Sequence, residues 1–516
     1  MRNIFISIIV TLPSLLFSQT IVSGLIKDQY DTPLPGATIF DQTDGLGVTT
    51  NFDGEFSIET KSENILIISF IGYKDVILKS PFDEFYTIQL VSDNDLDEVV
   101  ITALGIKKEE KALGYSVQGI KSSELNKVKS TNIINALSGK IAGVNITGSS
   151  AGPSASSNIN IRGASSLTGN NQPLFVVNGM PVTNDLYSFD DGLNGSTTID
   201  FGNAAQIINT DDINSISVLK GPAASALYGS RAANGVILIE TKTGVSQTEA
   251  FGVELNTSIQ FSNPLKLPNY QNEFGSGGGG KYSYLNGSTY IGVNQNYDAY
   301  GENWGPRMNG QLIKQFNSDG QSTPFTPAPD NIKNFYQTGT TLSTNIAINS
   351  SNDNGQSRFS YTHLGNMGII PNTDLERNTF QTSIGKNFFD DKLDFQFNSM
   401  FVRSTSDNIP NSGYDESSSV MYGWLWLPRQ VEIDDLRDYW IPGQEGVQQR
   451  YAENLWVNNP WFIVNENTNA FQSNRSISNL RLGYDLNENL NIRFRYGVDY
   501  VSEQRQYRRA PSTKGV

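Results

Sequence analysis

Several short stretches of the sequence combine residue types that could do chemistry. The segment from Gly275 to Lys281 reads Gly-Ser-Gly-Gly-Gly-Gly-Lys, close to a phosphate-binding loop. Such a loop needs a Ser or Thr after the lysine to hold Mg²⁺, and it follows a buried strand. Here Tyr282 follows the lysine and no such strand precedes the segment. The stretch is therefore better explained as an ordinary flexible loop.

Acidic residues occur in pairs at 190–191, 211–212 and 434–435, where they could bind calcium or act as acid and base. Acidic residues in loops are more often simply solvated. The motif Asn51-x-Asp53-Gly54 could hold a structural calcium ion, but it lacks the further ligands of a calcium loop and predicts a hairpin turn. The chain has no cysteine and one histidine, His363, so thiolate and multi-histidine metal sites are excluded. We therefore expect no cofactor beyond that possible calcium.

The stretch from residue 97 to 103, Asp-Glu-Val-Val-Ile-Thr-Ala, is rich in β-forming residues and has no obvious partner strand nearby. A run of charge, Lys107-Lys-Glu-Glu-Lys111, follows it. Charges beside an exposed strand protect it from aggregation. The pattern alone leaves two alternatives, an interdomain linker and a strand kept available for another protein.

The overall composition favours an exported, aromatic-rich β protein. The 516 residues include 47 Gly, 22 Tyr and 27 Phe, and the formal charge of −15 argues against nucleic acid as a partner. Arg2 precedes an apolar run over residues 4–17, too short to span a bilayer, which predicts a signal peptide at 1–18.

Hydrophobic periodicity divides the rest of the chain into three folded parts. Residues 20–91 have period-two stretches with turn signals, which predicts a small β-sandwich. Residues 92–110 form a linker, and 111–244 mix both periodicities as an α+β domain. In that domain we expect a helix from Thr131, strands at 158–162, 216–219 and 235–240, and a hairpin turning at Asn178-Gly179.

From residue 248 to 516 the strands are long and alternate apolar with polar residues, as in Phe251 to Phe261 and Ile492 to Tyr500. Short turns and long polar loops connect them, which is typical of an antiparallel transmembrane β-barrel. His363 is expected in one of these strands, facing the lumen. The segment has room for about ten strands, whereas a plugged transporter barrel needs about 22. We therefore expect an incomplete barrel and the N-terminal part of a longer protein.

Specific motifs add a family resemblance. Residues 20–91, through motifs between Gly24 and Tyr73, resemble a carboxypeptidase-regulatory-like domain. The order of the parts resembles the SusC/RagA family of TonB-dependent outer-membrane transporters. The matching motifs are Asp97-Glu-Val-Val-Ile-Thr-Ala103, Leu137-Ser-Gly-Lys-Ile-Ala-Gly-Val144, Asn160-Ile-Arg-Gly-Ala-Ser-Ser166, Pro173-Leu-Phe-Val-Val-Asn-Gly-Met-Pro181 and the segment from Ile216 to Gly235. The resemblance implies that 111–244 is a plug domain.

The resemblance also implies a function for the unpartnered strand. It corresponds to the TonB box, to which TonB, energised by ExbB and ExbD, adds by main-chain pairing. The implied TonB-binding residues are Asp97, Glu98, Val99, Val100, Ile101, Thr102 and Ala103. The implied activity is import of oligosaccharides or peptides across the outer membrane, with a SusD-like surface lipoprotein as lid. It involves no enzymatic step, so the resemblance implies that the chain is not an enzyme. Two alternatives remain, a siderophore or cobalamin receptor and a truncated fragment that transports nothing.

Aromatic residues cluster in two long loop segments, where rigid rings could stack on sugars or contact the lid. The candidates for substrate or lid contact are Tyr282, Tyr284, Trp304, Trp424, Trp426 and Trp440. An aromatic girdle at the membrane interface is the third alternative.

Overall fold

A computed structural model describes most of residues 19–514. The segments outside the described residues within that span are 29–30, 62–63, 71–72, 80, 84, 91–98, 102–106, 110–116, 126–131, 150–151, 153–154, 168–169, 185–187, 190–198, 204–206, 245–249, 283–302, 316–320, 353–354, 412, 414, 452–456 and 488. The chain divides into two compact units, one formed by residues 1–100 and 107–113 and the other by 101–106 and 114–516. The predicted signal peptide lies outside the described residues.

The first unit is a sandwich of two sheets, as the sequence predicts. One sheet has the order β4-β1-β7, where β1 (Gln19–Lys27) is antiparallel to β4 (Glu55–Lys61) and parallel to β7 (Phe85–Gln89). The other has the order β3-β2-β5-β6, from Gly47–Thr49, Thr38–Asp41, Ile65–Ser69 and Val76–Lys79. Alternate residues of both sheets point into a shared apolar core that includes Val22, Ile39, Ile58 and Leu66.

One carboxylate is buried at the edge of this core. Asp41 has no solvent exposure, and its Oδ2 accepts hydrogen bonds from Thr60 Oγ1 and Asn64 Nδ2, each at 2.7 Å. Its Oδ1 accepts from the backbone N–H groups of Thr43 and Asp44. Burial alone would raise the pKa of Asp41, but these four hydrogen bonds to the charged form outweigh it and hold the pKa below its usual value.

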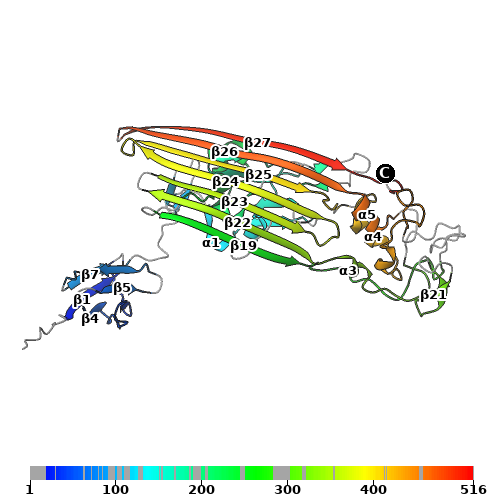
Figure 1. Cartoon of the computed structure of the whole chain (residues 1–516), viewed down its shortest axis with the longest axis horizontal. Coiled ribbons are helices and arrows are strands. Elements are labelled where there is room, and N and C mark those ends of the chain that lie inside the picture. Colours follow the sequence, from blue (N-terminus) through cyan, green and yellow to red (C-terminus); the bar gives the residue numbers. More distant parts are fainter. Residues whose placement is uncertain are drawn as a thin grey trace, which may run out of the picture. The chain divides into compact units, whose positions relative to one another are not determined.

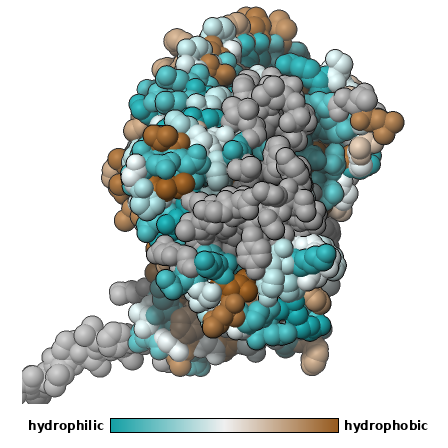
Figure 2. Space-filling view, turned by 90° about the vertical axis from the view of Figure 1, so that its right-hand side faces the viewer, coloured by the Kyte–Doolittle hydropathy of each residue, from teal (hydrophilic) through white to brown (hydrophobic). Residues whose placement is uncertain are grey.

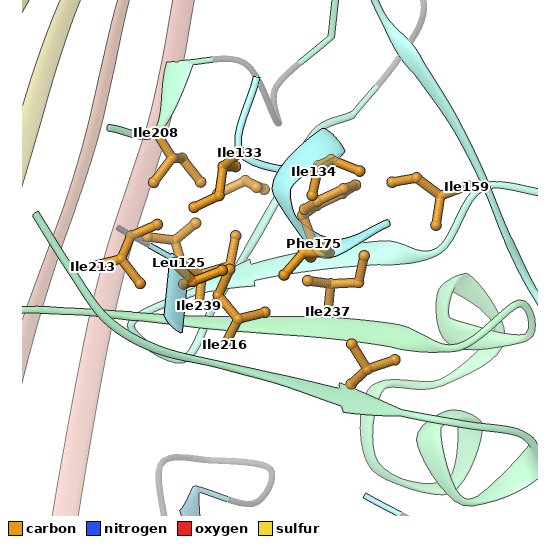
Figure 3. Packing of buried hydrophobic residues seen from close by; sticks show 14 of the residues in the cluster. Leu125, Ile133, Ile134, Ile159, Phe175, Ile208, Ile213, Ile216, Ile237 and Ile239 are labelled. Atoms are coloured by element: carbon orange, nitrogen blue, oxygen red, sulfur yellow. The ribbon is translucent and has the colours of Figure 1, made fainter. Parts of the chain in front are cut away.

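The second unit contains the α+β domain expected at 111–244. Its five-stranded sheet has the order β10-β17-β18-β13-β14, from Val117–Lys121, Ile213–Leu219, Val236–Thr241, Leu174–Val177 and Met180–Val182. The short helices α1 (Ser122–Leu125) and α2 (Pro222–Tyr228) accompany it, and β11 (Val144–Gly148) pairs with β12 (Ser157–Ile161). Two further two-residue strands, β15 (Ser188–Phe189) and β16 (Ile199–Asp200), pair with each other. Figure 3 shows how Phe175, Ile216, Ile237 and Ile239 from the sheet meet Ile133 and Ile134 in one buried cluster.

Local signals in this domain were partly right. Asn178 and Gly179 have φ values of 48° and 77°, so the predicted two-residue turn between β13 and β14 is confirmed. The predicted helix from Thr131 is wrong, because only a 3₁₀ turn, Asn135–Leu137, forms there. The expected apolar residues are nevertheless buried, at Ile133, Ile134, Leu137 and Ile141. Burial of these residues therefore did not require a complete helix.

Seven long antiparallel strands form the wall of the second unit, and we call this sheet the wall (Figure 1). In order they are β19 (Ala250–Ser262), β22 (Gly339–Asn352), β23 (Gly355–Met367), β24 (Asp374–Phe388), β25 (Leu393–Ser406), β26 (Asn469–Asn487) and β27 (Leu490–Tyr507). Among the helices of the described residues, none has the length and apolarity that a membrane-spanning helix requires.

Apolar and polar residues alternate along the wall strands, and they point to opposite faces of the sheet as the sequence predicts. Phe251, Leu255 and Phe261 of β19 are 74%, 69% and 67% exposed, and Ile492 and Tyr496 of β27 are 56% and 60% exposed. Polar residues on the opposite face, such as Asn345 of β22, are buried. The wall therefore has an apolar outer face and a polar inner face.

Two sequence predictions about the wall are corrected. The described residues contain seven wall strands instead of about ten. The described residues of two long segments, 263–338 and 407–468, form loops instead of wall strands. These loops hold β20 (Leu312–Lys314), β21 (Ser322–Pro324), α3 (Asn331–Phe335), α4 (Val420–Trp426), the 3₁₀ turn Ile433–Leu436 and α5 (Pro460–Glu466). His363 lies in β23, as predicted. On this strand Ser360 and Thr362 point to the face that contacts the inner domain, so the side chain of His363 points to the opposite face. It therefore belongs to the outer face and does not face the lumen.

The hydrogen bonds of Asp41 predict its contribution to the first unit. Replacing Asp41 with Ala leaves the donors on Thr60 and Asn64 without this buried acceptor, so we expect the free energy of unfolding of that unit to fall by about 2–4 kcal/mol. Denaturant unfolding of the first unit measures the change, and Asp53→Ala, at an exposed turn, is the matched control. A loss for Asp41→Ala no larger than that of the control would contradict the assignment.

The lowered pKa of Asp41 gives this prediction a pH dependence. Because the folded unit favours the ionised carboxylate, the contribution of Asp41 is fully present above its ordinary pKa of 3.8. It is lost as the pH falls through the lower pKa of the folded state. The difference in stability between the native sequence and Asp41→Ala should therefore shrink below about pH 4 and stay constant near neutral pH.

Candidate functional site

The predicted TonB box contains a strand with one partner. Val99–Ile101 form β8, which pairs with β9 (Lys107–Glu109) in a two-stranded sheet. Asp97, Glu98, Thr102 and Ala103 lie outside the described residues. The sequence predicted an unpaired strand that the charged run Lys107–Lys111 protects from aggregation. In the structure, residues 107–109 of that run form β9, the strand that pairs with β8. In a sheet of two strands each strand has one further edge, and no described strand pairs with that edge of β8.

The inner domain, from here on called the plug, is held against the polar face of the wall by a buried ion pair. Asp212, directly before β17, lies 2.9 Å from Arg358 of β23, measured from Oδ1 to Nη2. The two side chains are 3% and 1% exposed. Ser360 Oγ donates to the same carboxylate oxygen at 2.7 Å. We call Asp212 and Arg358 the latch.

Neighbouring side chains complete the surroundings of the latch. Arg358 Nη1 donates to Asn349 Oδ1 at 3.0 Å and lies 3.6 Å from Glu254 Oε2. Asn349 Nδ2 donates to Glu254 Oε1 at 2.9 Å, and Lys242 Nζ of the plug lies 3.8 Å from that carboxylate. A charge taken out of water is stable only when it is paired and hydrogen-bonded. Both members of the latch are paired and hydrogen-bonded, and of their side-chain atoms only Arg358 Nε is left without a partner among the described residues.

A second contact ties the β13–β14 hairpin to the last two wall strands. Arg475 Nε and Nη2 form a two-point ion pair with Asp499, at 2.8 and 2.6 Å. Together they hold the backbone of Thr183, whose N–H donates to Asp499 and whose carbonyl accepts from Arg475. Arg495 Nη1 donates to the carbonyl of Gly179 at the hairpin turn, at 2.9 Å. The hairpin is thus fixed through its backbone.

Apolar contacts reinforce these polar ones. Met400, Val402 and Ile477 of the wall belong to the same buried cluster as the plug core. At Gly497 an added Cβ would meet the side chain of Met180 of the plug, so the methionine would have to shift to make room for it. The plug is therefore packed as well as hydrogen-bonded against the wall.

Arg429 organises the long loops at one end of the wall. It is 3% exposed and donates to Asn331 Oδ1, Asn272 Oδ1 and the carbonyls of Gln271, Ala328 and Pro329. Burial lowers its pKa, while the nearby Tyr270 raises it by a smaller amount. The loop that follows β19 and the loop that follows β25 are therefore joined into one packed structure.

The predicted aromatic contact residues divide into exposed and buried groups. Trp304 is 70% exposed and remains a candidate for ligand or lid contact. Trp424 is 3% exposed and packs on Phe335 at 4.8 Å between ring centroids, so in this structure its ring is part of the loop core.

The remaining candidates are partly buried or outside the described residues. Tyr282 packs on Phe325 at 5.6 Å, Trp426 on Tyr422 at 6.4 Å, and Trp440 on Phe462 at 5.2 Å. Tyr284 lies outside the described residues. Figure 2 views this loop end, where hydrophilic residues cover most of the visible described surface and hydrophobic residues form small separate patches.

Sequence reasoning undervalued the acidic pair at 211–212. Both residues are 2% exposed, so they are not solvated loop acids, and Asp212 is half of the latch. An acidic pair directly before a buried strand was the available signal. Its partner Arg358 is distant in sequence, so only the fold brings the two together.

Two family models match the chain. The TonB-dependent receptor plug domain matches residues 109–236, and the CarboxypepD_reg-like domain matches residues 22–101. These matches confirm the two domain types that the sequence motifs indicated.

Curated relatives and solved structures agree with these matches. The chain is 32% identical over 461 residues to TonB-dependent receptor SusC of Bacteroides thetaiotaomicron, covering 89% of this chain and 40% of that protein. It is 36% identical over 165 residues, 32% of this chain, to the probable TonB-dependent siderophore receptor PirA of Acinetobacter baumannii.

The fold is similar to that of the RagAB peptide importer in its open-open state. The TM-score is 0.58 at 20% identity, covering 80% of this chain and 43% of that one. Compared with SusC, the chain spans about 40% of the relative's length. The relatives found are receptors and transporters, which confirms the prediction that the chain is not an enzyme. For the part of such a receptor that this chain spans, the predicted resemblance to the SusC/RagA family of TonB-dependent receptors is confirmed.

Proposed function

We propose that the receptor carrying this sequence imports oligosaccharides or peptides across the outer membrane, energised by TonB. The observation that carries the proposal is a plug pinned to the polar face of a wall, preceded by a short strand with only one described partner. The short turns at 352–355, 388–393 and 487–490 would face the periplasm, and the long loops would face the outside. The outer apolar face of the wall would contact lipid.

TonB would bind by adding a strand to β8. Main-chain hydrogen bonds supply the affinity in this mode, and alternate side chains supply selectivity. β8 already pairs with β9 on one edge, so TonB would use the second edge or displace β9. No chemical step in the chain is then needed, because force on the strand does the work.

A pull on β8 would reach the plug at β10. This strand lies at the edge of the plug sheet and pairs with β17 over five residue pairs. The latch and the hairpin contact hold β17 and β13–β14 to the wall. The pull would therefore separate β10 from a part of the plug that stays in place, and open a path beside the wall.

The substrate class rests on the relatives. RagAB is a peptide importer, and SusC is a curated relative that is 32% identical over 89% of this chain. We propose a SusD-like surface lipoprotein as the lid over the long loops, with Trp304 among the exposed contact residues. The match to PirA favours a siderophore as the second candidate.

Growth of a deletion strain tests the proposed substrate class. We expect loss of growth on particular oligosaccharides or peptides as sole nutrient, restored by the receptor gene. Normal growth on the whole panel, combined with a defect only when iron is scarce, would support the siderophore candidate instead.

The pairing of β8 with TonB predicts a proline effect. Replacing Val99 and Ile101 with Pro removes two N–H groups from the same edge of the strand, so uptake should be abolished while substrate still binds at the cell surface. The control, Val99→Thr with Ile101→Thr, keeps both N–H groups and the β preference and should keep uptake. Radiolabelled uptake and surface binding are measured together, and undiminished uptake in the proline variant would reject the assignment of the box.

The latch predicts a second pair of variants. Arg358→Met leaves Asp212 buried without its partner, so the contact between plug and wall should weaken by about 3–5 kcal/mol. Limited proteolysis of the plug in the receptor should become faster. Adding Asp212→Leu removes the unpaired charge and should restore most of the resistance.

Arg437→Met is the matched control for the latch, because Arg437 and its partner Asp434 are 61% and 63% exposed. An exposed pair contributes about 1 kcal/mol or less, so this variant should behave like the native receptor. Equal proteolysis of the Arg358→Met and Arg437→Met variants would show that the latch does not hold the plug.

A further inference from the structure

The outer face of the wall changes from apolar to polar towards the long loops, and β25 shows the change clearly. Its outward positions before the change are Leu393, Phe395, Phe397, Ser399 and Phe401. Arg403 occupies the next outward position and is exposed, whereas Val402 and Ser404 on the inner face are buried. A cation therefore directly follows the apolar stretch of this strand.

The length of the apolar stretch indicates how deep Arg403 would lie in a membrane. From Leu393 to Phe401 the strand is about 27 Å long, at about 3.4 Å per residue. With the strand tilt of about 40° that is usual for outer-membrane proteins, it covers about 21 Å of membrane depth, close to the usual apolar band of about 25 Å. Arg403 would lie about 5 Å beyond this band, within the headgroup layer.

Polar side chains flank Arg403 on both neighbouring strands. Asn378 of β24 and Asn474 of β26 are directly opposite it. Its Nη2 donates to Gln472 Oε1 of β26 at 3.1 Å. Within the described part of the chain Arg403 forms no ion pair with a carboxylate. A guanidinium has five N–H donors, so most of those of Arg403 remain available to an external anion.

One acidic residue lies nearby on β24, but its contacts are with other side chains. Glu376 is directly opposite Thr405, two residues beyond Arg403. Its Oε1 accepts from Asn378 Nδ2 at 3.0 Å and lies 4.0 Å from His363 Nδ1. Glu376 therefore has partners on β23 and β24 and does not neutralise Arg403.

Aromatic rings lie next to Arg403 on its apolar side. Phe401 and Phe380 are directly opposite each other on β25 and β24 and are 42% and 53% exposed. Arginine binds phosphate oxygens through two parallel N–H groups. A free phosphate ion would contact only the polar groups, whereas the acyl chains of a lipid would also cover the rings. Cation and rings together therefore match a phosphate-bearing anionic lipid.

We propose that Arg403, with Gln472 and Asn474, binds the phosphate of an anionic lipid in the outer leaflet. The acyl chains of this lipid lie along Phe401 and Phe380. The outer leaflet is the one concerned because the long loops face the outside. The inference rests on the membrane placement of the wall, which is part of the proposed function.

Lipid binding can be measured at this position because the sequence has no cysteine of its own. In the receptor without other cysteines, Ser476→Cys on β26, directly opposite Phe401, carries a bimane fluorophore. The labelled receptor is placed in phosphatidylcholine vesicles that contain a rising fraction of brominated phosphatidylglycerol or brominated phosphatidylcholine. Bromine on the acyl chains quenches the fluorophore on contact, so quenching reports which lipid occupies the site.

We expect phosphatidylglycerol to occupy the site about tenfold more readily than phosphatidylcholine, because its headgroup is anionic. Arg403→Gln should abolish this preference, and Arg403→Lys, which keeps the charge but not the two-point geometry, should retain part of it. Arg403→Met is the second variant in case Arg403→Gln does not fold. Arg437→Gln, which removes an exposed loop arginine, is the matched control and should keep the full preference.

A native receptor without the preference would overturn the proposal, and so would a preference that survives the loss of Arg403. Inorganic phosphate should reduce the preference no more than sodium chloride of the same ionic strength. A loss with phosphate alone would show a site for free anions and overturn the lipid assignment.

Further results separate this inference from the proposed function. If neither brominated lipid quenches the fluorophore, the outer face does not contact lipid and the proposed membrane placement is refuted. A receptor that shows the lipid preference but imports no oligosaccharide or peptide would refute the proposed function and leave the lipid site in place.

Discussion

A β-strand sends successive side chains to opposite faces, and the second unit depends on this constraint. Each wall strand is apolar on one face and polar on the other, so pairing seven of them gives a sheet with two chemically different surfaces. The outer surface exposes residues such as Phe251 and Tyr496. The inner surface can hold a domain only through polar groups and a few apolar contacts, which explains the form of the plug contacts.

The latch is the clearest result of that constraint. Arg358 is among the largest fully buried side chains of the described residues, and it is buried because Asp212 and Asn349 accept its hydrogen bonds. An ion pair in such a place adds little stability relative to apolar packing, but breaking it is costly. It therefore specifies where the plug sits more than it adds to overall stability. The hairpin contact, with Arg475 and Asp499 holding the backbone of Thr183, works in the same way.

Between the latch and the hairpin contact, the surfaces of plug and wall that face each other are polar. Some parts of the plug are therefore firmly attached to the wall and others are not. Fixed contacts position β17 and the β13–β14 hairpin, while the edge strand β10 has one described neighbour in its sheet. Elsewhere along the seam, the hydroxyls of Ser258, Ser343 and Thr379 face space that water can occupy. At the loop end, Arg429 joins two long loops into one packed body.

The sequence by itself determined the domain order, the sandwich, the turn at Asn178-Gly179 and the faces of the wall strands. All of these follow from local signals, namely period-two alternation, turn residues and short motifs. It overestimated the number of wall strands, because that number came from the chain length available, and loops with short helices such as Val420–Trp426 take up more of the chain than the estimate allowed. It also predicted a helix at Thr131 where only a 3₁₀ turn forms, since apolar spacing does not show how a segment will be buried.

Only the tertiary structure decided which residues meet across the seam. Asp212 and Arg358, Asp499 and Thr183, and Asn209 and Thr362 are each far apart in the chain, and nothing local marks them as partners. The same holds for the aromatic residues. Trp424 and Trp304 both lie in aromatic-rich loop segments of the sequence, but they are 3% and 70% exposed. Side-chain periodicity is a property of one strand, whereas burial and pairing depend on what the fold places opposite it.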